Sequence, residues 1–292
     1  MYEENLTALP QGDFSTIFAD VLADVQRATR PGPPERILAG NVIRWANTDI
    51  QPHFARICRR LLLPGSGIFG IVHLAEAARL ADEGHSCIIC LNHRSNLDVP
   101  TLCALLEDQG NEQLFQRVIW IAGRKLHEDV GATPMLVQAF NQVIVSPRSW
   151  LKDGHSYAEL WKAHLINIAA HRAIRKLRHQ GWMFALFPAA TRLRPRDPST
   201  AQAIEETDSY LKHFEFMLLC RIEGCTLPVS REQDLTHETP TLDRMRYVFA
   251  AVQRTDAWRE QAKRRFAECN RRAASAKAIV EDIAAIRSAA TP

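Results

Sequence analysis

Residues 87–98 read Cys-Ile-Ile-Cys-Leu-Asn-His-Arg-Ser-Asn-Leu-Asp, a short apolar run followed by a polar turn. The apolar run predicts a buried strand, and residues 100–107 continue with a helical pattern. Similar apolar runs occur at residues 118–122, 142–145, 183–187 and 225–229, with helical stretches at 135–140 and 157–180 between them. Strands that alternate with helices predict an α/β fold with a mostly parallel central sheet flanked by helices.

The regions on either side of this pattern look helical. Residues 1–30 carry apolar side chains at helical spacing, residues 31–34 read Pro-Gly-Pro-Pro, and further helical patterns cover 36–63 and 71–83. We therefore predict a small N-terminal helical domain over residues 1–80. The α/β domain then covers residues 81–292 and ends in a long helix or helix pair at 255–290.

Composition limits the classes of function. The 292 residues are 46% hydrophobic and 24% charged, and the net charge of +3 is too small to indicate nucleic-acid binding. Seven cysteines, an odd number without a secretory signal, indicate a reduced, cytoplasmic setting. The most apolar stretch, residues 61–74, is broken by proline and glycine and is shorter than a spanning helix. Peripheral contact with the inner face of the membrane stays open.

His93 and Asp98 form a His-x4-Asp pattern just after the first apolar run. Imidazole can accept a proton from a hydroxyl near neutral pH, and a carboxylate can fix its tautomer and stabilise the resulting cation. The pair could therefore activate an alcohol for attack on an acyl group. Alternatively, Asp98 is the N-cap of the following helix with Pro100 in its first turn, and the motif taken alone favours this cap.

Arginines follow two other apolar runs. Arg192 and Arg194 come shortly after residues 183–187, and Arg148 follows residues 142–145. Since sites form at the carboxyl ends of parallel strands, we expect these side chains to converge near His93. Guanidinium groups can fork onto phosphate oxygens, although solvated loop arginines are the ordinary alternative.

Four blocks now resemble the glycerolipid acyltransferases in order and approximate spacing: residues 92–98, 143–148, 187–192 and 226–229. Ala189 and Ala190 stand where that family has glutamate and glycine. The run at 190–198, Ala-Thr-Arg-Leu-Arg-Pro-Arg-Asp-Pro, is similar to the soluble plastid-type glycerol-3-phosphate acyltransferases. The paired basic residues which that subgroup has after its middle strand are reduced here to Arg148.

The resemblance implies transfer of a fatty acyl group from an acyl thioester (acyl-ACP or acyl-CoA) to the sn-1 hydroxyl of glycerol 3-phosphate. His93 is expected to be the general base, oriented by Asp98, while Arg148, Arg192 and Arg194 bind the substrate phosphate. Backbone amides near the start of the helix after Asp98 are candidates for binding the oxyanion. The closest alternative is a lysophosphatidate acyltransferase, followed by a basic binding module and an inactive relative.

No cofactor and no metal are expected. Cys87 and Cys90 lie three apart in a predicted strand and so face opposite sides, which favours core packing over a metal site. Basic patches at residues 172–178 and 254–265 are typical of solvated helix faces. They could also hold acyl carrier protein, coenzyme A phosphates or anionic lipid.

Overall fold

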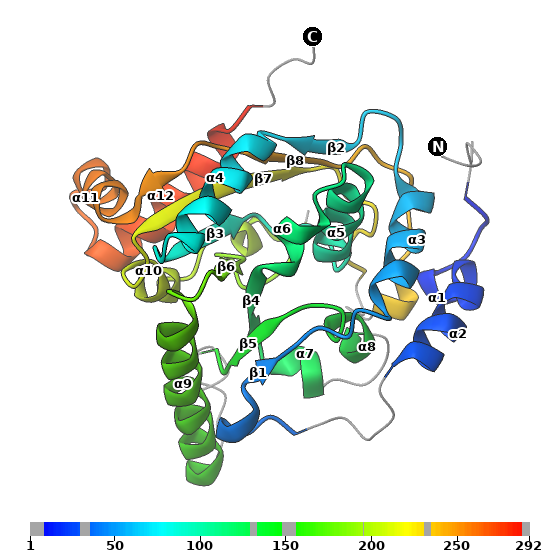
Figure 1. Ribbon diagram of the computed structural model, residues 1–292, viewed down its shortest axis with the longest axis horizontal. Coiled ribbons are helices and arrows are strands. Elements are labelled where there is room, and N and C mark those ends of the chain that lie inside the picture. The colour runs from blue at the N-terminus through cyan, green and yellow to red at the C-terminus, as the bar shows by residue number, and fades with distance from the viewer. Residues whose placement is uncertain are drawn as a thin grey trace.

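A computed structural model describes residues 9–29, 36–128, 133–147, 156–194, 196–230 and 235–287 (Figure 1). Its centre is one sheet in the order β1-β5-β4-β6-β3-β7-β8-β2, with β9 also paired to β7. The strands are β1 Ile43–Arg44, β2 Gly67–Phe69, β3 Cys87–Leu91, β4 Val118–Gly123, β5 Gln142–Val145, β6 Met183–Leu186, β7 Phe216–Glu223, β8 Arg246–Phe249 and β9 Gln253–Arg254.

The central strands run parallel. β5, β4, β6, β3 and β7 are parallel in succession, and β2 is parallel to β8. The antiparallel pairs are β1 with β5, and β7 with both β8 and β9. The mostly parallel sheet that the sequence predicts is therefore confirmed. The carboxyl ends of β3, β4, β5 and β6 meet at one edge of the sheet.

Helices cover both faces of this sheet. They are α1 Phe14–Ile17, α2 Ala19–Ala28, α3 Gln51–Leu61, α4 Ile71–Asp82, α5 Asp98–Asp108, α6 Glu112–Gln116, α7 Lys125–Glu128, α8 Thr133–Val137, α9 Tyr157–Leu177, α10 Glu206–Leu211, α11 Thr255–Arg265 and α12 Arg271–Ala285. Ile89 of β3 packs in one hydrophobic cluster with residues of α1 to α6, and Ile88 packs in a second cluster with α9, α11 and α12. Both sides of β3 are thus buried, which explains its unbroken apolar sequence.

The N-terminal region differs from its prediction. A helix was expected over residues 36–63, but the structure has a helix only at α3 and places the strand β1 at Ile43–Arg44. β2 also comes from the first eighty residues, and side chains of α1, α2 and α3 share a cluster with β3 and α5. The division of the chain at residue 80 stays a prediction.

One predicted strand is wrong. The run at 225–229 is not a strand. The strand β7 lies just before it, at Phe216–Glu223, and is followed by Gly224, whose φ of 85° in the left-handed region breaks the extended backbone. The strands predicted at 87–91, 118–122, 142–145 and 183–187 agree with β3, β4, β5 and β6 to within one residue. Among the described residues, no helix combines the length and apolar character needed to cross a bilayer.

Candidate active site

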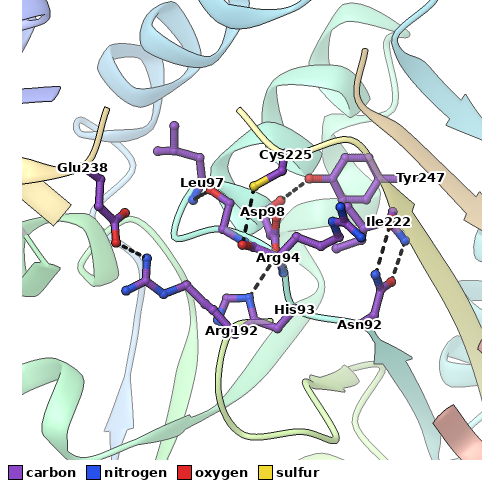
Figure 2. Close-up of polar contacts among 11 residues, drawn as sticks. Asn92, His93, Arg94, Leu97, Asp98, Arg192, Ile222, Cys225, Glu238 and Tyr247 are labelled. Atoms are coloured by element: carbon purple, nitrogen blue, oxygen red, sulfur yellow. Dashed lines mark hydrogen bonds and ion pairs between the residues drawn. The ribbon is translucent and has the colours of Figure 1, made fainter. Parts of the chain in front are cut away.

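The turn between β3 and α5 is anchored to the neighbouring strand. Asn92 follows β3 directly, and its side-chain oxygen accepts a hydrogen bond from the backbone N–H of Ile222 in β7 at 2.6 Å. Its amide nitrogen donates to the carbonyl oxygen of Ile222 at 3.0 Å (Figure 2). The side chain of Asn92 thereby continues the pairing of β3 with β7 and fixes the position of the backbone at His93.

Asp98 holds this turn from its other end. Its Oδ2 lies 2.9 Å from Nδ1 of His93 and accepts the backbone N–H groups of Arg94 at 2.7 Å and Ser95 at 3.0 Å. The side chain is only 1% exposed. The N-cap of α5 is Leu97, so Asp98 does not cap the helix but lies in its first turn, where a negative charge is stabilised. The amides of Arg94 and Ser95 are used by this carboxylate.

The imidazole of His93 is held in a stack of aromatic rings. It lies on Phe187, with ring centroids 4.0 Å apart and planes 12° apart, and Phe187 in turn lies on Trp120 at 5.5 Å. These residues come from the carboxyl ends of β3 and β6 and from β4. Since Nδ1 faces Asp98, the tautomer that donates from Nδ1 leaves the lone pair on Nε2. The ring is therefore oriented as a general base requires.

A buried tyrosine on β8, two strands from β3 in the sheet, supports the same turn. The hydroxyl of Tyr247, in β8, donates to the backbone carbonyl oxygen of Asp98 at 2.6 Å (Figure 2). Burial raises the pKa of this phenol well above its usual value, so it stays a hydrogen-bond donor. The sequence analysis did not identify Tyr247 or the role of Asn92, because neither belongs to a local pattern that points to His93.

A cavity of about 1290 Å³ opens beside His93. Apolar side chains such as Val99, Trp120 and Phe140 form part of its wall. Two acidic side chains line it, Glu128 and Glu206, and Glu128 pairs with Arg124 at 3.0 Å. The basic side chains in the lining are more numerous: Arg124, Lys125, His164, His171, Arg172 and Arg175. Burial, and then the charge of Lys212, lowers the pKa of His171. The cavity therefore combines a positioned imidazole, a cationic region and an apolar surface, a combination suited to an anionic substrate with an apolar part.

The arginines predicted to bind phosphate are placed differently. Arg192 pairs with Glu238 at 2.5 Å; the glutamate is fully buried and the arginine side chain is 12% exposed (Figure 2). Neither Arg192 nor Arg194 is among the residues that line the large cavity, and Arg148 lies outside the described residues. The phosphate-binding role of these three arginines stays a prediction.

The segment that carries Arg192 nevertheless lies where the strand-end argument put it. The backbone N–H of Leu193 donates to the carbonyl oxygen of His93 at 2.9 Å, so the two motif segments are joined directly. Ala190 lies between the end of β6 and Leu193 and has a φ of 54°, which is unusual for a residue other than glycine. The order of the strands therefore places the Arg192 segment next to the His93 turn, but the side chain of Arg192 points toward Glu238.

The cysteine pair of β3 is part of the core. Cys87 packs in the cluster with α1 to α6, and Cys90 packs in the cluster on the other face of the sheet. Burial raises the pKa of the Cys87 thiol to about 12. Two thiols on opposite faces of a strand cannot bind one metal ion together.

Residues 72–216 match the family model described as Acyltransferase, a segment that contains His93, Asp98 and Arg192. A comparison with curated proteins found no match.

Proposed function

We propose that the chain acylates the sn-1 hydroxyl of glycerol 3-phosphate from an acyl thioester, a reaction supported by the match of residues 72–216 to the family model described as Acyltransferase. The observation that carries this proposal is the His93–Asp98 pair beside a cavity lined by cations. An oriented imidazole suits the hydroxyl of the acceptor, and the cations suit its phosphate. The thioester of acyl carrier protein or of coenzyme A is the proposed donor.

His93 moves the proton in this reaction. The acceptor oxygen attacks the carbonyl carbon of the thioester while its proton passes to Nε2 of His93. The tetrahedral adduct then collapses, the carbon–sulfur bond breaks, and the departing thiolate takes the proton from the imidazolium. Asp98 keeps Nδ1 engaged throughout and stabilises the transient positive charge. The acyl group passes directly between substrates, so no acyl-enzyme forms.

The phosphate is proposed to bind the cations of the cavity. Arg172 and Arg175 extend from α9, and Lys125 is the first residue of α7, so cations line the cavity from two elements. A guanidinium fork can hold two phosphate oxygens at once. Arg192 would have to leave Glu238 to join them. We therefore place the main phosphate contacts on α9 and keep Arg148, Arg192 and Arg194 as predicted contributors.

The size of the cavity bears on the second substrate. A volume of about 1290 Å³ exceeds what glycerol 3-phosphate needs, and the apolar wall formed by residues such as Leu136, Val137 and Phe140 offers room for a fatty acyl chain. In the proposed reaction this chain belongs to the donor. The same space could hold the chain of lysophosphatidate, which is the second candidate acceptor.

The test is thiol release from an acyl thioester by the purified full chain, measured separately with glycerol 3-phosphate and with lysophosphatidate. We expect release that depends on glycerol 3-phosphate and falls about 10²–10⁴-fold in His93→Gln. Arg172→Gln should raise the KM for glycerol 3-phosphate about 10-fold or more, the loss of one charged hydrogen bond. Arg272→Gln, an exposed change on α12 outside both basic patches, is the matched control.

Two outcomes would contradict the proposal. Release with lysophosphatidate alone would replace the acceptor and leave the role of His93 intact. No release from either thioester with either acceptor would overturn the proposed activity, provided the chain gives a cooperative unfolding transition.

A further inference from the structure

Helix α9 presents an exposed stripe of apolar and aromatic side chains. Tyr157 is 82% exposed, Trp161 52% and Leu165 38%. The three lie four residues apart and therefore on one face of the helix. The opposite face is buried: Ala163 is inaccessible, and Ile166, Ala170 and further apolar residues belong to the core cluster. Figure 1 shows α9 along one edge of the molecule, with its lower end projecting beyond the sheet.

The exposed surface of α9 is also cationic. Lys162, Arg172, Arg175 and Lys176 are all exposed, whereas Glu159 is the one acidic residue in the helix sequence. The carboxylate of Glu159 is occupied in a capping box, since it accepts hydrogen bonds from the backbone and hydroxyl of Ser156. The apolar stripe thus lies among positive charges.

This surface leads to the large cavity. His164, Ile168 and Arg172 of α9 line the cavity; His164 is next to Leu165, and the other two lie about one and two turns further along the helix. Leu126 of α7 lines the cavity as well and is 36% exposed. Apolar side chains therefore border the cavity on α7 as well as on α9.

We propose that this face of α9 binds the surface of an anionic lipid bilayer. Tyrosine and tryptophan have an apolar ring and a polar tip, which suits them to the level of the lipid headgroups. Lysine and arginine beside them attract anionic headgroups. The proposal rests on the proposed function in one respect: an acyl chain handled in the cavity could then pass between protein and bilayer without crossing water.

A second copy of the chain is a weaker occupant for the stripe. An aromatic side chain covers about 150–250 Å² in all, and these are only partly exposed. The stripe therefore falls well short of the roughly 800 Å² that each partner contributes to a stable complex. Like charges on two copies of α9 would also repel.

The experiment is co-sedimentation of the full chain with vesicles, without any substrate. Vesicles of phosphatidylcholine alone are compared with vesicles that contain phosphatidylglycerol. We expect binding to the anionic vesicles that weakens at high salt. Trp161→Ser should lower the partition coefficient about tenfold, and Lys162→Gln and Lys176→Gln about fivefold each.

The controls are exposed residues on other helices. Val72→Ser on α4, where Val72 is 66% exposed, matches the apolar change, and Arg272→Gln, an exposed position on α12 outside both basic patches, matches the charge change. Both should bind vesicles as the parent does. Trp161→Ser should keep its thiol-release activity toward soluble short-chain thioesters, so a failure of vesicle binding and a failure of the proposed function are distinguishable.

Three results would overturn the inference. They are no binding of the parent chain to anionic vesicles, equal binding by Trp161→Ser and the parent, and a dimer of the parent that Trp161→Ser abolishes. The last result would assign the stripe to contact between copies.

Discussion

The substitution Asp98→Asn separates the charge of Asp98 from its hydrogen bonds. Oδ2 accepts all three bonds of the carboxylate, from His93, Arg94 and Ser95. Oδ1 is buried and has no hydrogen-bond partner among the described residues. Asparagine can therefore place its carbonyl oxygen where Oδ2 lies and its amide nitrogen where Oδ1 lies. Every bond that orients the turn is kept, and only the negative charge is lost.

The expected cost is catalytic rather than structural. The charge of Asp98 stabilises the imidazolium that forms on His93, and two charges about 4 Å apart interact by about 4 kcal/mol at an effective dielectric constant near 20. That corresponds to a fall in kcat of about 10³-fold. The free energy of unfolding should fall less than in a variant that removes the acceptor, because the three donors keep theirs and the only new unpaired group is the amide nitrogen at the position of Oδ1.

Asp98→Ala is the matched comparison. It leaves the donors of His93, Arg94 and Ser95 without an acceptor, at about 1–3 kcal/mol for each that stays buried. Thermal unfolding should therefore separate the two variants, with Asp98→Ala melting clearly lower. Both should be nearly inactive in the thiol-release assay. A kcat for Asp98→Asn within about threefold of the parent value would refute the argument that the charge assists His93.

Three further predictions concern neighbouring features. Arg192→Met should lower the free energy of unfolding by about 3–5 kcal/mol in urea titrations, because it removes the guanidinium that pairs with the fully buried carboxylate of Glu238. Parent-like stability with a raised KM for the acceptor would instead favour the predicted phosphate role. Ala190→Gly should raise the free energy of unfolding by about 1 kcal/mol, because the φ of 54° suits glycine, and a decrease in the same titration would contradict this. Burial, and then the charge of Lys212, lowers the pKa of His213, so below about pH 6.5 the unfolded chain binds more protons than the folded chain. The melting temperature should therefore fall as the pH drops below that value, and it should fall less in His213→Gln.

The central strands could be predicted from sequence for a specific physical reason. Parallel strands covered on both faces are continuous apolar runs, and Cys87–Leu91 and Gln142–Val145 were located to the residue. β1, β2 and β9 have two or three residues each, too few to show any alternation. The strand predicted at 225–229 was misplaced because its apolar residues, which include the block at 226–229, lie just past the real strand β7.

The site was predicted in part, and the missing partners share one property. His93 and Asp98 are close in sequence, so their spacing was visible. Asn92 pairs with Ile222 and Asp98 with Tyr247, contacts between residues more than a hundred positions apart. No local period in a single sequence reports such a contact. The same holds for the pair of Arg192 and Glu238, which only the packed fold brings together.

The cations of α9 show why side-chain direction matters more than strand ends for the proposed phosphate site. From sequence, Arg172 and Arg175 look like part of a solvated helix face, yet α9 packs against β5 through its small apolar residues and turns these arginines to the cavity. Arg192 follows a strand end, as expected, but its segment is bonded to His93 through Leu193. A substitution at Arg192 would therefore disturb the general base together with any phosphate contact. Arg172 lies on a separate element, so a change in KM without a change in kcat there isolates phosphate binding.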